Sequence, residues 1–178
     1  MVELALHILD IVENATRAGA AIVAVIVASS RLTNLMTISI EDDGPGLPVE
    51  PEQALDPFFT TKMGKRTGLG LSLFRAAAEQ AAGCFELTRS DLGGVAVRAQ
   101  FQRDHLDRAP LGDLAGTLAM AALTHPETDF WCVLRWDEGE TVVQRFELAA
   151  AQGVAAGEMG AVRGFEAAIR EGLGFVEA

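Results

Sequence analysis

Within residues 1–103, one order of apolar patterns occurs twice: a helical pattern followed by two strand patterns. The helical patterns repeat apolar side chains at steps of three and four, whereas the strand patterns alternate or are rich in β-branched residues. These patterns predict helices at 4–18 and 70–82, and strands at 21–28, 35–41, 84–89 and 95–102. Strands in one layer with helices in the other predict an α+β fold, a two-layer α/β sandwich.

Two of the expected strands differ in pattern. Residues 21–28 are apolar throughout, which is typical of a strand buried on both faces. Residues 35–41 alternate instead, so Met36, Ile38 and Ile40 are expected on the core face. Between this strand and the second helix, residues 42–68 are rich in glycine, proline and charged residues. A loop of this length inside a compact domain is typical of lids and binding loops.

After Arg103 the pattern changes, and a polar connector ends at Pro110. Beyond it we expect two helices around two strands: a helix from 111 that ends near His125-Pro126, strands at 129–136 and 140–148, and a last helix reaching about 172. Residues 149–164, rich in alanine and glycine, show no clear period. The sequence therefore predicts two domains, 1–103 and a small α-β-β-α extension at 104–178 that serves docking or dimerisation.

The net charge of the chain limits the classes of binding partner that we expect. Lys+Arg 14 against Asp+Glu 25 gives a formal net charge of -11. Nucleic acids and anionic membranes are bound through basic side chains, so we expect neither as a partner. The acidic start at Met1-Val2-Glu3 is unlike a signal peptide, and the longest apolar run, 20–28, is too short to span a bilayer. We therefore expect a cytoplasmic protein.

Polar side chains on the first helix form one candidate site. His7, Asp10, Asn14 and Arg17 recur at steps of three and four, which predicts a single polar stripe. Asp10 and Asn14 lie one turn apart and offer a carboxylate and an amide oxygen, ligands that suit Mg²⁺. By itself the stripe is more typical of a solvated helix face.

Asp42 is the second candidate, because it continues the row of Met36, Ile38 and Ile40 and so points towards the apolar layer. A buried carboxylate needs a hydrogen-bond partner. The exocyclic amine of adenine or a water molecule would serve, and Gly44 and Gly46 would let a ring approach the backbone. The alternative is a simple Asp-Gly turn that closes the strand.

The third candidate is Thr67-Gly68-Leu69-Gly70, which opens the second helix. Free N–H groups at a helix N-terminus bind phosphate. Three cations directly precede this segment in an otherwise acidic chain, namely Lys62, Lys65 and Arg66. Two glycines before a helix are weak evidence alone, and the cations favour an anion site.

Taken in order, these segments resemble the four motifs of the GHKL ATPases, the family of histidine kinases and gyrase-like topoisomerases with the Bergerat ATP-binding fold. Residues 10–15 match the N box and 42–46 the first glycine box. Residues 56–62 match the F box of histidine kinases, and 67–71 the second glycine box. Four boxes in the correct order and spacing are far more specific than any one of them.

The resemblance implies ATP and Mg²⁺ as cofactors, with Asn14 as the metal ligand and Asp42 bound to the adenine amine. It also implies a lid over roughly 47–67, anchored by Phe58 and Phe59. The implied nucleotide-binding residues are Asn14, Asp42, Gly44, Gly46, Lys62, Lys65, Arg66, Thr67, Gly68, Leu69 and Gly70.

Three features depart from the family pattern. Asp10, the candidate catalytic residue, stands where hydrolytic members have a glutamate base and histidine kinases usually have asparagine. Arg66 replaces a glycine of the second box. No histidine has the acidic neighbour usual at a phosphoacceptor, so His7, His105 and His125 are expected to be structural.

Two functions stay open at this point. One is an enzyme that hydrolyses ATP slowly, with Asp10 as base, or transfers phosphate to a partner. The other is a nucleotide-sensing module in which ATP orders the lid and changes a partner surface. An unidentified protein partner is expected in either case, and a homodimer is an open alternative. The whole chain is also similar to small stand-alone ATP-binding proteins of iron-only hydrogenase gene neighbourhoods.

Overall fold

The computed structural model describes residues 3–47 and 69–177. Three strands, at 84–89, 95–102 and 129–136, have the predicted bounds. The helices are α1 (Leu4–Arg17), α3 (Leu69–Gln80), α4 (Leu114–Thr124), α5 (Arg145–Gln152) and α6 (Met159–Glu177). The strands are β1 (Ile22–Ser30), β2 (Leu35–Asp42), β3 (Cys84–Arg89), β4 (Val95–Gln102), β5 (Asp129–Trp136) and β6 (Gly139–Gln144).

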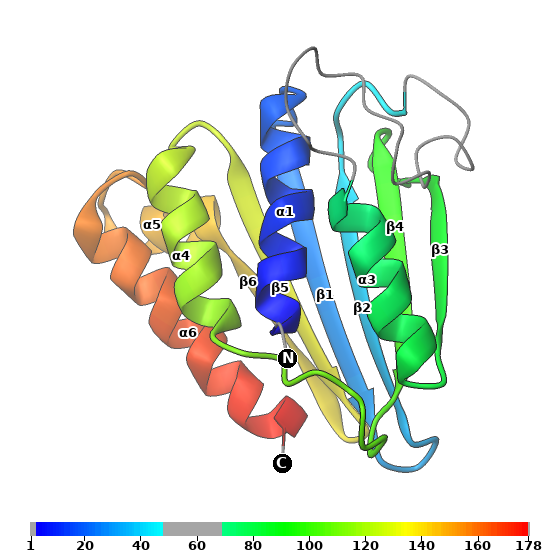
Figure 1. The fold of residues 1–178 in the computed structure, drawn as a ribbon. Helices are drawn as coiled ribbons and strands as arrows, with labels where there is room; N and C mark the ends of the chain where they lie inside the picture. Colours follow the sequence, from blue (N-terminus) through cyan, green and yellow to red (C-terminus); the bar gives the residue numbers. More distant parts are fainter. Residues whose placement is uncertain (1–2, 48–68, 178) are drawn as a thin grey trace.

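Within the described residues, the strands form one six-stranded sheet in the order β3-β4-β2-β1-β5-β6. Neighbouring strands are antiparallel except β1 and β5, which run parallel with Val25 opposite Cys132. Helices α1, α3, α4 and α6 lie side by side on one face of the sheet (Figure 1). The predicted two-layer α+β sandwich is therefore confirmed.

Region 104–178 continues the sheet of the first region. Strand β5 pairs with β1 from Ile22 to Ala28, and β6 then pairs with β5. At the start of α1, the N–H groups of Leu4 and Ala5 donate to the carbonyls of Pro110 and Leu111 at 2.9 and 2.8 Å. The two sides of the boundary predicted at 103 thus share one sheet and one hydrophobic core.

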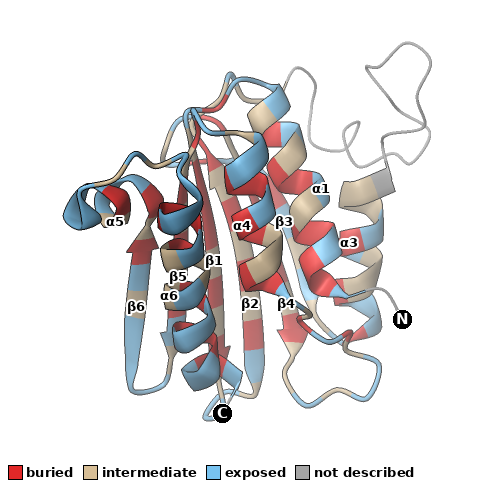
Figure 2. Ribbon diagram, turned by 90° about the vertical axis from the view of Figure 1, so that its left-hand side faces the viewer, coloured by how far each residue is buried: buried red, intermediate tan, exposed pale blue. Residues whose placement is uncertain are grey.

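The core lies between the sheet and the helix layer, where buried positions gather in Figure 2. Helix α1 turns its apolar stripe inward, with Leu4, Ile8 and Val12 fully buried. Met36, Ile38 and Ile40 of β2 are buried as expected from their alternation. Burying one such side chain contributes about 1.5–3 kcal/mol. No helix in the described part of the chain is long and apolar enough to cross a membrane.

Strand β1 is not buried on both faces, contrary to the expectation from its continuous apolar run. Val23, Val25 and Val27 point into the core, whereas Ile26 and Ala28 are only half-buried. Strands β2 and β5 flank β1, but α1, α3, α4 and α6 all lie on the same face of the sheet (Figure 1). A central strand with one covered face keeps its other face partly open to water.

The C-terminal region has one more helix than predicted. Strand β6 ends at Gln144, not at 148, and α5 follows directly over residues assigned to that strand and to the unpatterned segment. The carboxylate of Asp129 accepts from the N–H of Phe146 at 3.0 Å, which satisfies a free donor in the first turn of α5. Helix α6 continues past Gly172, where the missing side chain lets the helix approach Leu134 of β5.

Candidate functional site

The candidate residues gather at one end of the sandwich. There α1 ends, α3 begins, and β2 runs into the loop that starts after Asp42 (Figure 1). Gly44 lies against the connection between α1 and β1, because a Cβ on Gly44 would be 3.7 Å from the Cβ of Ala20. The fold therefore brings the end of the helix that carries the N box and the first glycine box to a common edge.

Asp42 is buried, as strand parity predicts. Its Oδ1 accepts hydrogen bonds from the backbone N–H of Gly44 at 2.9 Å and of Val95 at 3.3 Å, and its own carbonyl accepts from Gly94 at 3.0 Å. Among the described residues, no hydrogen bond reaches the other carboxylate oxygen, Oδ2. The side chain is thus fixed by two donors and keeps one oxygen available as an acceptor.

Glycines surround this carboxylate closely. A Cβ on Gly44 would lie 2.9 Å from Oδ1 of Asp42. A Cβ on Gly94 would collide with the same oxygen and lie 2.6 Å from the backbone nitrogen of Gly44. Gly46 has a φ of 83°, a left-handed conformation that glycine adopts without strain. Gly94 received no role from the sequence, and it directly precedes β4, the strand that pairs with β2.

Asp43 is a second residue that the sequence analysis left without a role. Its Oδ1 accepts from the N–H groups of Ala21 and Ile22 at 2.8 and 2.9 Å. Its own N–H donates to the carbonyl of Ile22 at 3.3 Å. These bonds tie the start of β1 to the loop after β2, so Asp43 holds the backbone that places Asp42.

A hollow of about 360 Å³ opens beside this loop. Pockets for small molecules typically range from about 300 to 1,000 Å³. Two residues of its wall, Gly94 and Val95, also contact Asp42. The wall comprises Pro45, Gly46, Leu47, Thr88, Arg89, Gly93, Gly94 and Val95.

Asp10 and Asn14 lie on the exposed side of α1, as the stripe predicts. Asp10 faces the start of α3, because a Cβ on Gly70 would lie 3.1 Å from the Cβ of Asp10 and 3.5 Å from its Oδ2. The Oδ1 of Asn14 accepts from the guanidinium of Arg17 at 3.2 Å. The structure therefore brings Asp10 and Gly70 together, as a joint site requires.

His7 does not belong to the polar stripe in which the sequence analysis placed it. It is buried, and its ring stacks on Phe74 of α3 with centroids 5.8 Å apart. Burial lowers the pKa of His7 from its usual 6.5, while the charge of Asp10 opposes this shift. The expectation of a structural role for His7 is met by a side chain that packs between α1 and α3.

The lowered pKa of His7 predicts a stability that depends on pH. The unfolded chain binds a proton at His7 as pH falls through 6.5, whereas the folded chain binds it only near its lower pKa. The contribution of His7 to stability is therefore complete above pH 6.5 and is lost as pH falls towards the folded pKa. We expect the free energy of unfolding, from urea titrations at pH 7.5 and 5.5, to fall more in the parent than in His7→Leu. Parallel losses in the two proteins would refute this assignment.

The remaining candidates from the second glycine box and its cations lie outside the described residues: Lys62, Lys65, Arg66, Thr67 and Gly68. The same holds for the F box at 56–62. Leu69 and Gly70 form the first turn of α3. Among the described residues, no three histidine, cysteine or acidic side chains are placed to hold a metal ion.

The chain is thus an α+β sandwich with the buried carboxylate of Asp42 and an adjoining hollow at one end of its sheet. Residues 2–105 match the family described as "Histidine kinase-, DNA gyrase B-, and HSP90-like ATPase". The match covers more than half of the chain, which therefore belongs to this family of ATP-binding domains, as the four boxes predict.

Individual relatives match over stretches of different length. The sensor histidine kinase CpxA of Escherichia coli (strain K12) is 38% identical over 66 residues, which are 34% of this chain and 14% of that kinase. The ATP-binding domain of PrrB from Mycobacterium tuberculosis is 30% identical, with a TM-score of 0.42 over 55% of this chain and 64% of that one. The Aquifex aeolicus MutL ATPase domain complexed with ADP is 15% identical, with a TM-score of 0.49 over 86% and 70%.

Proposed function

We propose that this chain binds ATP together with Mg²⁺ and either hydrolyses it slowly or passes phosphate to a protein partner. The observation that carries the proposal is the buried carboxylate of Asp42, held by two backbone donors and surrounded by glycines. A carboxylate in this position accepts a hydrogen bond from the amine of adenine. The family match supports a nucleotide, ATP, as the ligand of this site.

The residues present fit these cofactors. Gly44 and Gly94 leave no room for a side chain beside Asp42, and the adjoining hollow has the size of a small-molecule pocket. Asp10 and Asn14 offer a carboxylate and an amide oxygen from one side of α1, which are the hard donors that Mg²⁺ prefers. Bound Mg²⁺ would neutralise phosphate charge, and Asn14 would ligate it.

Asp10 separates the two functions that the sequence leaves open. Its carboxylate lies beside Gly70 at the start of α3, where a helix N-terminus favours phosphate. This position suits a general base for an attacking water and favours hydrolysis over binding alone. A steady-state assay with MgATP tests it: turnover that disappears in Asp10→Asn supports an ATPase. ATP binding without turnover in the parent supports a nucleotide-sensing module whose lid controls a partner surface.

The preference for ATP over GTP can be tested separately. A charged hydrogen bond contributes about 1.5–3 kcal/mol, so ATP should bind about tenfold to a hundredfold more tightly than GTP, whose carbonyl would face the carboxylate of Asp42. Calorimetry with Mg²⁺ and each nucleotide measures this ratio. Asp42→Asn should remove most of the preference, whereas Asp91→Asn, the same change in charge at an exposed turn, should keep it. Equal affinities of the parent for both nucleotides would end the proposal for Asp42.

The partner remains part of the proposal. A protein that receives phosphate or reads the nucleotide state, or a second copy of this chain, fits the acidic surface better than a nucleic acid does. An association with iron-only hydrogenases also stays a prediction.

A further inference from the structure

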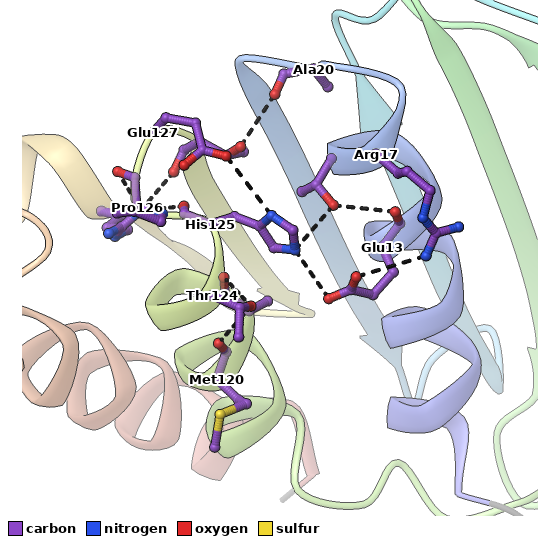
Figure 3. Close-up of polar contacts among 12 residues, drawn as sticks. Glu13, Arg17, Ala20, Met120, Thr124, His125, Pro126 and Glu127 are labelled. Atoms are coloured by element: carbon purple, nitrogen blue, oxygen red, sulfur yellow. Dashed lines mark hydrogen bonds and ion pairs between the residues drawn. The ribbon is translucent and has the colours of Figure 1, made fainter.

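The loop after α4 contacts the outer side of α1 through one histidine. His125 ends α4, and its imidazole points towards α1 (Figure 3). Its Nε2 lies 3.2 Å from Oε1 of Glu13 and 3.4 Å from Oγ1 of Thr16. On its other side, Nδ1 lies 3.9 Å from the carboxylate of Glu127. We name His125, Glu13 and Arg17 the His125 relay.

His125 is itself fixed by the C-terminal region. Its N–H donates to Ala121 at 2.9 Å, and its carbonyl accepts from the guanidinium of Arg145 at 3.2 Å. Three residues further on, the hydroxyl of Thr128 donates to the carbonyl of Ala20 at 3.2 Å. The backbone that carries the imidazole is therefore held by α4 and by Arg145, in addition to the contacts of the ring with α1.

From Glu13 the contacts continue to the proposed magnesium ligand. The second oxygen of Glu13, Oε2, lies 4.0 Å from Nη2 of Arg17, one turn along α1. The other terminal nitrogen of Arg17, Nη1, donates to Oδ1 of Asn14 at 3.2 Å. Glu13 thus faces His125 with one oxygen and, with the other, faces the arginine that holds Asn14.

We propose that His125 is a positioning residue for the nucleotide site: through Glu13 and Arg17 it sets the orientation of the Asn14 amide. The inference rests on the proposed function, in which Asn14 ligates Mg²⁺. When the imidazole is removed, Glu13 loses the contact that holds its carboxylate beside Arg17. Arg17 then no longer sets the orientation of the Asn14 amide. Groups that orient a ligand from behind commonly change metal affinity about tenfold or more.

The predicted effect is on the magnesium dependence of nucleotide binding. The side chains of His125 and Glu13 are 23% and 34% exposed, so solvent weakens their contact and the effect should be moderate. In His125→Ala, the Mg²⁺ concentration for half-maximal ATP binding should rise about three- to tenfold, with little change in ATP affinity in EDTA. A purely structural role would weaken binding equally with and without the metal.

Two conservative variants identify the contact. The amide nitrogen of Gln reaches about as far as Nε2 of histidine, whereas that of Asn corresponds to Nδ1. His125→Gln should therefore keep the magnesium dependence of the parent, and His125→Asn should behave as His125→Ala. Glu13→Gln, which keeps the shape but not the charge facing Arg17, should also raise the magnesium requirement. Parent behaviour in His125→Ala and Glu13→Gln, or identical behaviour of the Gln and Asn variants, would overturn the inference.

A second measurement separates this inference from the proposed function. In nucleotide-free protein, the NMR signals of the Asn14 side-chain amide and the Arg17 Nε–H should shift in His125→Ala and return in His125→Gln. If the parent fails to bind ATP, the proposed function fails, but these shifts still support the orientation of Asn14 by His125. If ATP binds and the signals do not move, the relay is refuted and the proposed function stands.

Discussion

Arg145→Ala is expected to lower the free energy of unfolding by about 3–5 kcal/mol. Arg145 is the largest fully buried side chain of the described structure, with 1% of its surface exposed. Its guanidinium donates to the carbonyls of His125, Pro126, Thr128 and Ala156, the shortest of these bonds being 2.7 Å to Thr128. Truncation leaves these acceptors without their charged donor, and a buried acceptor without a partner costs about 1–3 kcal/mol.

Two variants show whether the loss comes from these bonds. Arg145→Lys keeps a charge but offers a single ammonium, which cannot reach four carbonyls, so it should recover only part of the stability. Arg135→Ala removes an exposed arginine paired with Glu140 and should cost about 1 kcal/mol or less. Urea unfolding of the three variants gives the order. A loss in Arg145→Ala no larger than in Arg135→Ala would show that the four carbonyls do not need this donor.

The same residue explains where prediction from sequence failed. The sequence pattern placed Arg145 within a strand that was expected to end at 148. Burial lowers the pKa of the Arg145 guanidinium, while Asp129 and Glu127 oppose this shift. Its acceptors lie in the loop at 125–128 and just after the end of α5. Contacts with such distant residues leave no pattern in the sequence around Arg145. Strands β3, β4 and β5, by contrast, have the predicted bounds, because their alternation and their flanking turns are local signals.

The candidate site divides in the same way. Strand parity is a local property, and it placed Asp42 on the buried side correctly. Helical spacing placed Asp10 and Asn14 on the exposed side of α1, yet it assigned His7 to the same stripe because spacing alone does not show that α3 covers His7. Gly94 and Asp43 received no role because their partners, Asp42 and the start of β1, become neighbours only when the sheet forms.

The most damaging single change at the proposed site is expected at Gly94. In Gly94→Ala the new methyl group would collide with Oδ1 of Asp42 and lie 2.7 Å from the carbonyl oxygen of Asp42. Most of the atoms it meets belong to the backbone, which cannot turn aside as a long side chain would. We expect a loss of about 2–4 kcal/mol in the free energy of unfolding. ATP affinity should fall about tenfold to a hundredfold, because the displaced carboxylate loses its charged hydrogen bond to adenine.

Gly174→Ala is the matched control, since a Cβ at this position in α6 meets no atom within 4 Å. Replacing a helical glycine by alanine at an open position stabilises a protein by about 0.5–1 kcal/mol, so this variant should unfold at equal or higher urea concentration and bind ATP as the parent does. Urea unfolding and calorimetry with MgATP on both variants separate a local collision from a general effect of the substitution. If Gly94→Ala kept the ATP affinity of the parent, the carboxylate of Asp42 would not be the group that recognises adenine. The hollow beside it would then bind another ligand.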